Sequence, residues 1–207
     1  RARSEPTLPS TIGQEKAVAL LESSLKKGRL SHAYLFLGPE GVGRKALALE
    51  LAKAGNCLQS EPPCGQCTSC KRISFGHHAD VISYNLISQG EYVSAAAADA
   101  EGGHREISKD TIKELQEMAN LSPFEGKKRV FIIEEADLLS EEASNRLLKI
   151  LEEPPSAVLI ILLAQAIRTP HGQQAARGGL LPTIVSRCQV IELHTVSFSQ
   201  LEKTLIS

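Results

Sequence analysis

The chain has 207 residues, enough for one sizeable domain with a small appendage, and 42% of them are hydrophobic. A formal net charge of −1 and only 4% aromatic residues exclude a globally basic nucleic-acid binder and an extended base-stacking surface. No apolar run reaches the roughly 20 residues that cross a bilayer, and the first residues lack a signal-peptide core, so we expect a cytoplasmic protein with no membrane partner.

Helical and strand patterns alternate along the chain. Residues 1–10 form an extended lead-in, and helical spacing of apolar residues predicts a helix that ends at Leu25. The uniformly apolar run 33–37 is typical of a strand buried in a parallel sheet. Four further strands are predicted at 80–84, 130–133, 158–163 and 188–193, with helices at 46–53, 108–121 and 140–153. The alternation predicts an α/β domain with a parallel five-stranded sheet and helices on both faces.

Two stretches lack periodicity and are interpreted as flexible insertions. Residues 86–106 are rich in Ala and Gly, and residues 164–180 are polar and rich in Gly and Gln. The domain is therefore expected to span 11–196, and residues 197–207 have the pattern of a starting helix.

The residues after the first strand have the glycine spacing of a phosphate-binding loop. Gly38, Gly41 and Gly43 are in place, but Arg44 stands where that motif has the Lys that reaches the phosphates. Lys45 stands where the motif has the hydroxyl that ligates Mg²⁺, and an ammonium group cannot ligate a cation. The sequence therefore disfavours Mg²⁺-ATP at this site. Phosphate binding without turnover stays open, because Arg44 and the loop amides can hold an anion.

A cysteine-rich segment follows the helix after this loop. Its members are Cys57, Cys64, Cys67 and Cys70. In a chain without a secretion signal, two C-x2-C steps with turn-forming Pro and Gly favour one structural Zn²⁺ over disulfides. Four thiolates complete a tetrahedral site and leave no open position for catalysis, so His77 and His78 are assigned to the surface.

Three runs carry a resemblance to a known family. They are HAYLFLG at 32–38, NRLLKILEEPP at 145–155 and LPTIVSRC at 181–188. These runs resemble the AAA+ subunits of the bacterial replicative clamp loader of DNA polymerase III, and the similarity covers about residues 11–193. Subunits of the delta-prime type are the most similar, and the four-Cys segment belongs to the same pattern.

The resemblance implies an AAA+ P-loop fold with a small zinc-binding insertion at 57–70. Glu134 and Glu135 take the positions of the Mg²⁺-binding Asp and the catalytic Glu of that family. Arg187 matches the arginine finger that enters a neighbouring subunit's ATP site, and Ser186 would cap or orient it. Ala164 and Gln165 stand where other members carry a polar sensor. A helical lid from residue 197 and a C-terminal collar, absent here, would complete such a subunit.

The implied function is that of a non-hydrolysing, delta-prime-type subunit that lends Arg187 in trans while the complex loads the sliding clamp. The implied partners are the gamma/tau and delta subunits, the sliding clamp, and primer-template DNA through the assembly. An active ATPase subunit of gamma/tau type is the alternative, and Arg44 with Lys45 discriminates against it. An unrelated zinc interaction module is a third possibility, which the family runs argue against. For Arg187 alone the alternative is a surface salt bridge, and for Cys188 core packing is expected.

Overall fold

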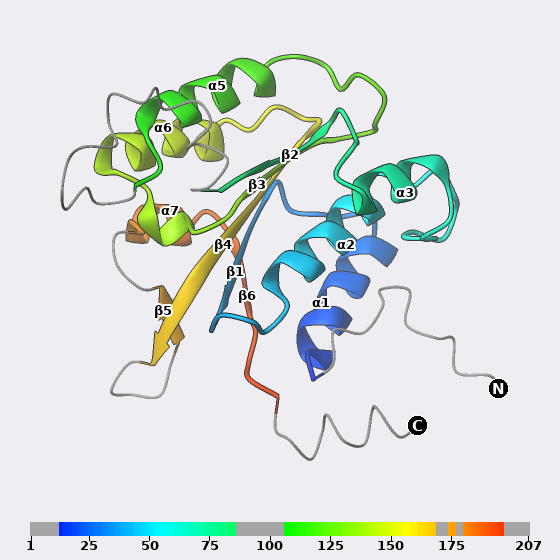
Figure 1. The fold of residues 1–207 in the computed structure, drawn as a ribbon, viewed down its shortest axis with the longest axis horizontal. Helices are drawn as coiled ribbons and strands as arrows, with labels where there is room; N and C mark the ends of the chain where they lie inside the picture. The colour runs from blue at the N-terminus through cyan, green and yellow to red at the C-terminus, as the bar shows by residue number, and fades with distance from the viewer. Residues whose placement is uncertain (1–12, 86–105, 169–173, 177–179, 197–207) are drawn as a thin grey trace.

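A computed structural model describes residues 13–85, 106–168, 174–176 and 180–196. Five parallel strands form the centre of the molecule (Figure 1). Their spatial order is β2 (Val81–Tyr84), β3 (Arg129–Ile133), β4 (Val158–Arg168), β1 (Ala33–Gly38) and β6 (Gln189–Glu192). The expected parallel five-stranded α/β sheet is confirmed.

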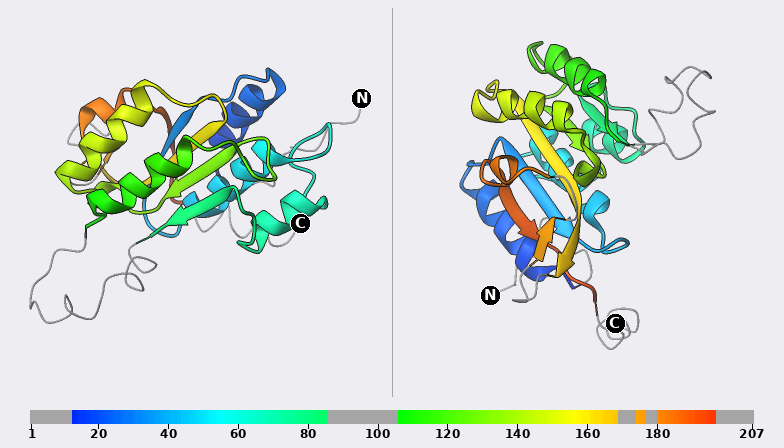
Figure 2. Two further views of the ribbon diagram at one scale, coloured as in Figure 1. Left: turned by 90° about the horizontal axis from the view of Figure 1, so that it is seen from above. Right: turned by 90° about the vertical axis from the view of Figure 1, so that its left-hand side faces the viewer.

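Helices cover both faces of this sheet, as expected. One face carries α1 (Glu15–Lys26), α2 (Arg44–Asn56) and α3 (Thr68–Ser74). The other face carries α5 (Lys109–Ala119), α6 (Glu141–Glu152) and α7 (Pro182–Val185), with the 3₁₀ turn η2 (Ala136–Leu138). Figure 2 shows the two helical layers on either side of the strands.

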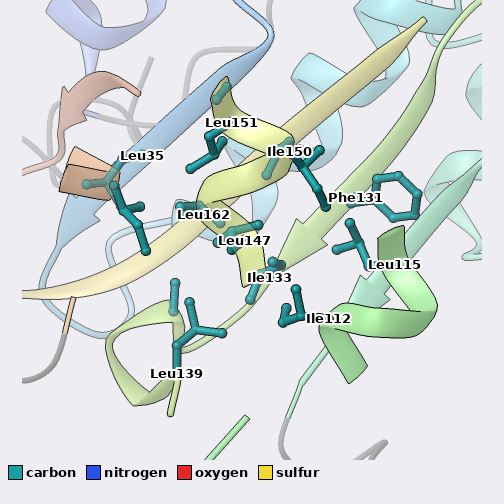
Figure 3. Packing of buried hydrophobic residues seen from close by; sticks show 14 of the residues in the cluster. Leu35, Ile112, Leu115, Phe131, Ile133, Leu139, Leu147, Ile150, Leu151 and Leu162 are labelled. Atoms are coloured by element: carbon teal, nitrogen blue, oxygen red, sulfur yellow. The ribbon is translucent and has the colours of Figure 1, made fainter. Parts of the chain in front are cut away.

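Alternating strand residues feed the two hydrophobic cores. In β1, Leu35 packs on the α5 and α6 side, whereas Tyr34 and Phe36 pack on the α1 and α2 side. Figure 3 shows the first of these cores, where leucines and isoleucines of the two helices lie over the strands: Ile112, Leu115, Leu147, Ile150 and Leu151 against Leu35, Phe131, Ile133 and Leu162. Because both faces are covered, the central strands β1 and β3 are buried along their whole length rather than at every second residue.

Serine caps start two of the helices where the sequence predicted them. The hydroxyl of Ser108 accepts from the Thr111 N–H at the start of α5, and that of Ser140 accepts from the Ala143 N–H at the start of α6. Each cap satisfies one of the unpaired N–H groups of a first helical turn. Pro154 and Pro155 follow Glu153, the C-cap residue of α6.

The interpretation of 164–180 as a flexible insertion is wrong for part of that range. Residues 164–168 continue β4, and β5 (Gln174–Ala176) pairs antiparallel with them in the register Ala166 to Ala176. Polar and small residues suggested a loop, but pairing between the two segments satisfies their backbone and overrides composition. The helices α3 and α7 were not predicted. The lead-in 1–10, most of the insertion 86–106 and the helix from 197 lie outside the described residues.

Among the helices that the structure describes, none has the length and hydropathy that a membrane span requires.

Candidate functional site

A pocket of about 280 Å³ lies where β1 and β3 end. Its lining is the loop after β1, the start of α2 and the acids after β3: Gly41, Gly43, Arg44, Lys45, Ala46, Glu134 and Glu135, with Leu163 of β4. Ligands of open α/β sheets bind at the carboxyl ends of the strands, so this is the position expected for a nucleotide. The structure thus brings both predicted halves of the site together.

The loop keeps the backbone geometry that its glycines permit. Gly41 and Gly43 have φ of 79° and 93°, a left-handed conformation that is strained for other residues. A Cβ on Gly38 would lie 2.9 Å from the carbonyl oxygen of Leu193, too close for any side chain. The backbone architecture of a phosphate loop is therefore present, and Gly43 is the N-cap residue of α2.

Lys45 and Glu134 occupy the two positions that the family resemblance assigns to Mg²⁺ binding, and they contact each other directly. Lys45 Nζ lies 2.8 Å from Glu134 Oε1, an ion pair that reaches from the first turn of α2 to the end of β3. The angle of approach is not that of a hydrogen bond, and Glu134 Oε1 is buried. In an intact site a cation lies between these two positions. Here the ammonium group itself neutralises Glu134.

Glu135, in the position of the catalytic base, has an unusual backbone. Its φ of 51° is the one left-handed conformation of a non-glycine residue in the described part of the chain. Such a residue costs roughly 1 kcal/mol or more and persists where the surroundings impose it. Two residues further on, Asp137 accepts a 3.1 Å hydrogen bond from the backbone N–H of Gln165, which ties this turn to β4.

Arg187 lies at the other end of the sheet. It stands between α7 and β6. Because Gln189 pairs with Tyr34, β1 ends at Gly38, six residues beyond the level of Arg187, and the loop that lines the pocket follows that end. At about 3.3 Å per residue, this separation is roughly 20 Å. Arg187 therefore cannot serve the pocket of its own chain.

Two contacts hold the guanidinium group of Arg187. Its Nη1 donates to the carbonyl oxygen of Thr183 at 3.0 Å, and its Nη2 donates to Glu152 Oε1 at 2.7 Å. Arg187 thus forms the surface ion pair that the sequence left as an alternative, with about a third of its side chain exposed. The Ser186 hydroxyl donates to the same Thr183 carbonyl at 3.0 Å and does not contact the guanidinium group through that bond. Burial raises the pKa of the neighbouring Cys188 thiol to about 12, in keeping with core packing.

The four predicted Cys converge. Their sulfur atoms all lie within 4.8 Å of one another. A tetrahedral Zn²⁺ with bonds of about 2.3 Å needs sulfurs about 3.8 Å apart, so small shifts complete the site. Backbone N–H groups of Cys64, Cys67 and Cys70 donate to the sulfurs of Cys57, Cys64 and Cys67 at 3.3–3.4 Å. Such donors stabilise thiolate charge, and the four residues can hold a metal such as zinc.

The cysteine segment is anchored to the sheet by its first residues. Asn56 Oδ1 accepts from the backbone N–H groups of Lys127 and Lys128 at 2.8 and 2.9 Å. The ammonium group of Lys127 donates to the Cys57 carbonyl oxygen. The segment before β3 therefore holds the cysteine segment in place.

The assignment of both histidines to the surface is wrong for His78, which is buried. Its Nδ1 accepts from the Asp80 N–H at 3.2 Å, so in the neutral ring Nε2 carries the proton and donates to Ser69 Oγ at 3.1 Å. His78 thereby ties α3 to the start of β2. It lies outside the sulfur cluster, as expected, and His77 is exposed.

Two further positioning residues were missed at the sequence level. Asp80 is buried and accepts 2.7 Å hydrogen bonds from the N–H groups of Phe124, Glu125 and Gly126, besides a 3.0 Å contact with Arg129. Gln14 binds both backbone groups of His194 through its side-chain amide, at 2.6 and 3.1 Å. The only signal for Asp80 is a charge that opens an apolar strand, and Gln14 offers none, because its partner lies 180 residues away.

Comparison with known proteins agrees with this geometry. A family profile described as "DNA polymerase III, delta subunit" matches residues 13–197. The chain is 37% identical to DNA polymerase III subunit delta' of Bacillus subtilis over 93% of its own length and 51% of that protein. It is 33% identical to DNA polymerase III subunit tau/gamma of Haemophilus influenzae over 96% of its own length and 25% of that protein.

Solved structures show the same fold. A gamma subunit-related protein of DNA polymerase III from Thermotoga maritima superimposes with a TM-score of 0.53 at 22% identity, over 86% of this chain and 47% of that one. The Thermotoga maritima RuvB Holliday junction branch migration motor gives 0.52 at 17% identity, over 96% and 52% of the two chains. The fold is thus the AAA+ P-loop type. The chain spans about half the length of the delta' relative and a quarter of the length of the tau/gamma relative. With 185 residues matched by its profile, the chain belongs to the DNA polymerase III delta-subunit family.

Proposed function

We propose that this chain is the AAA+ part of a non-hydrolysing, delta-prime-type clamp-loader subunit. In this proposal its own pocket is inert, Arg187 acts on the ATP of a neighbouring subunit, and Cys57, Cys64, Cys67 and Cys70 hold a structural Zn²⁺. The partners are the gamma/tau and delta subunits, the sliding clamp, and primer-template DNA bound by the whole assembly. The names of the relatives, which are subunits of DNA polymerase III, support the gamma/tau partners. The sliding clamp and the DNA follow from the family resemblance alone.

The ion pair between Lys45 and Glu134 is the observation that carries the proposal. Hydrolysis of ATP in this fold needs Mg²⁺ to neutralise charge that develops on the phosphates. A cation at that place would lie beside the ammonium group of Lys45 and would lose Glu134 as a ligand. Arg44 replaces the phosphate-binding Lys, so both cationic parts of the site have changed together.

The position of Arg187 supports action in trans. The backbone of Arg187 lies at the amino end of the sheet, roughly 20 Å along the strands from its own pocket, so its guanidinium group is available only to another chain. A planar group with paired N–H donors matches the oxygens of a transferring phosphoryl group. Arg187 would stabilise the transition state there without chemistry of its own.

An ATPase subunit of gamma/tau type is the second candidate. The identity of 33% to a tau/gamma protein favours it. Arg44 and Lys45 weigh against it, because a working phosphate loop has Lys followed by Ser or Thr.

Turnover of ATP tests the choice between them. We expect no Mg²⁺-dependent hydrolysis by the purified protein above background, and the double change Arg44→Lys with Lys45→Thr is expected to improve nucleotide binding. That double variant need not restore hydrolysis, because Glu134 and the altered sensor position remain. Steady turnover that Glu135→Gln abolishes would favour the gamma/tau type and overturn the proposal.

A further inference from the structure

We propose that Glu152 is a positioning residue for Arg187, holding its guanidinium group in the orientation that reaches a neighbour's phosphate. This inference rests on the proposed trans-acting role of Arg187. Glu152 is the last residue of α6, 35 residues before Arg187 in the chain.

The contacts fix the guanidinium group from two sides. Glu152 Oε1 accepts from Nη2 at 2.7 Å, and the Thr183 carbonyl accepts from Nη1 at 3.0 Å. A guanidinium group has five N–H donors in one plane, and each contact needs only one of them. Donors on Nε and on both terminal nitrogens are left for phosphate oxygens. The two anchors therefore set the plane of the group and still leave room for a bidentate contact.

The place of Glu152 in its helix is unfavourable without Arg187. A carboxylate in the last turn lies at the negative end of the helix dipole, where acids are disfavoured. Glu141 and Glu142 of the same helix lie at the favourable end, in its first turn. Helix stability therefore explains those two acids and does not explain Glu152.

Stability of the fold does not account for this ion pair either. The side chains of Arg187 and Glu152 are 35% and 50% exposed, and ion pairs that face solvent to this extent contribute little to folding. What the pair does supply is a fixed side-chain conformation. Arg187 has a long side chain with several rotatable bonds, and a catalytic group gains from being fixed before the substrate arrives. The same pair could instead hold Arg187 back from the phosphate, and this alternative gives the opposite kinetic result.

The test uses the full-length subunit assembled with ATPase partners and measures DNA-stimulated hydrolysis, with kcat and KM, and clamp loading. The variants are Arg187→Ala, Glu152→Ala, Glu152→Gln and the double change Arg187→Ala with Glu152→Ala. The matched control is Glu153→Ala, which removes the adjacent exposed carboxylate. Thermal melting of each subunit checks that the variants fold.

We expect Glu152→Ala to lower kcat by at least half as much as Arg187→Ala lowers it. KM should stay unchanged, because an arginine finger acts on the transition state. Glu152→Gln keeps an acceptor oxygen and is expected to stay close to wild type. The double variant is expected to match Arg187→Ala, and Glu153→Ala to match wild type.

Other outcomes separate the two proposals. If Arg187→Ala leaves both activities at the wild-type level, the trans-acting role itself fails. If Arg187→Ala is impaired while Glu152→Ala has unchanged or raised kcat, the role of Arg187 stands and Glu152 is not its positioning residue. A raised kcat would show that the ion pair restrains Arg187 instead.

Discussion

Three ion pairs of single residues neutralise charge at separate places in this molecule. Lys45 neutralises Glu134 where a cation would lie, Glu152 neutralises Arg187 at the opposite end of the sheet, and Asp80 is neutralised inside the protein. Of the three carboxylates, Asp80 is the most deeply buried. Its environment makes it the one with a measurable effect on folding.

The pH dependence of stability is predicted to reveal Asp80. Burial opposes ionisation, but N–H groups of Phe124, Glu125 and Gly126 and the nearby Arg129 outweigh it and lower the pKa of Asp80 to about 2. The group is ordinary in the unfolded chain, so its contribution is complete above about pH 4 and is lost as pH falls towards 2. That contribution is about 2 kcal/mol.

Urea unfolding between neutral pH and pH 2 measures this effect. Asp80→Asn is expected to be less stable by about 3 kcal/mol at neutral pH and to lose stability less steeply in acid than the parent. Asp110→Asn, at an exposed site in α5, is the matched control and should keep the acid slope. An unchanged slope in Asp80→Asn would contradict the assignment.

At the scale of elements, the cysteine segment is an appendage that is hydrogen-bonded to the residues before β3 and lies outside the two hydrophobic cores. Its anchors are the Asn56 and Cys57 carbonyl oxygens, which bind the residues before β3. Neither core cluster contains a cysteine of this segment. The sheet should therefore survive loss of the metal, while the segment should not.

Metal removal tests this separation. We expect one Zn²⁺ per chain in protein purified without chelators, and loss of the metal in Cys70→Ser. Far-UV circular dichroism of that variant should retain the sheet and most helix, while hydrogen exchange within 57–74 rises. Cys188→Ala controls for the number of thiols and should keep full zinc. Absence of zinc from the parent, or global unfolding of Cys70→Ser, would contradict this prediction.

Elements whose signals are local could be predicted, and those that depend on distant pairing could not. The serine caps at Ser108 and Ser140 and the apolar strands are visible within a few residues of sequence. The antiparallel pairing of the end of β4 with β5 is not visible locally, because its residues are mostly small or polar and are ordered by hydrogen bonds between the two segments. The same holds for the site: glycine and cysteine spacing predicted the loop and the cluster of four cysteines that can hold a metal. The contacts of Lys45 with Glu134 and of Arg187 with Glu152 needed the fold.

At the scale of the whole molecule, the two proposed functional positions lie at opposite ends of one rigid sheet. The pocket follows β1 and β3, whereas Arg187 precedes β6. An inert pocket predicts that Mg²⁺ adds nothing to the effect of nucleotide on stability.

The thermal midpoint measures this, because any ligand that binds only the native state raises it. Whatever shift ATP produces is expected to be the same in Mg²⁺ and in EDTA. The variant Lys45→Thr removes the ammonium group from Glu134 and is expected to make the shift larger in Mg²⁺. Lys16→Thr, an exposed change on α1, is the matched control. A parent protein whose midpoint rises more in Mg²⁺ than in EDTA would show that the ion pair does not replace the cation.

The separation of the pocket from Arg187 gives the subunit a polarity. In a ring built by head-to-tail contacts, each member has its nucleotide pocket at one interface and contributes its arginine to a neighbour's pocket at the other. A member with an inert pocket and a working arginine forms one interface that supports ATP hydrolysis and one interface that does not. Placing such a subunit in a ring of active ones therefore breaks the rotational equivalence of its members, and the proposed function would give the assembly a defined first and last position.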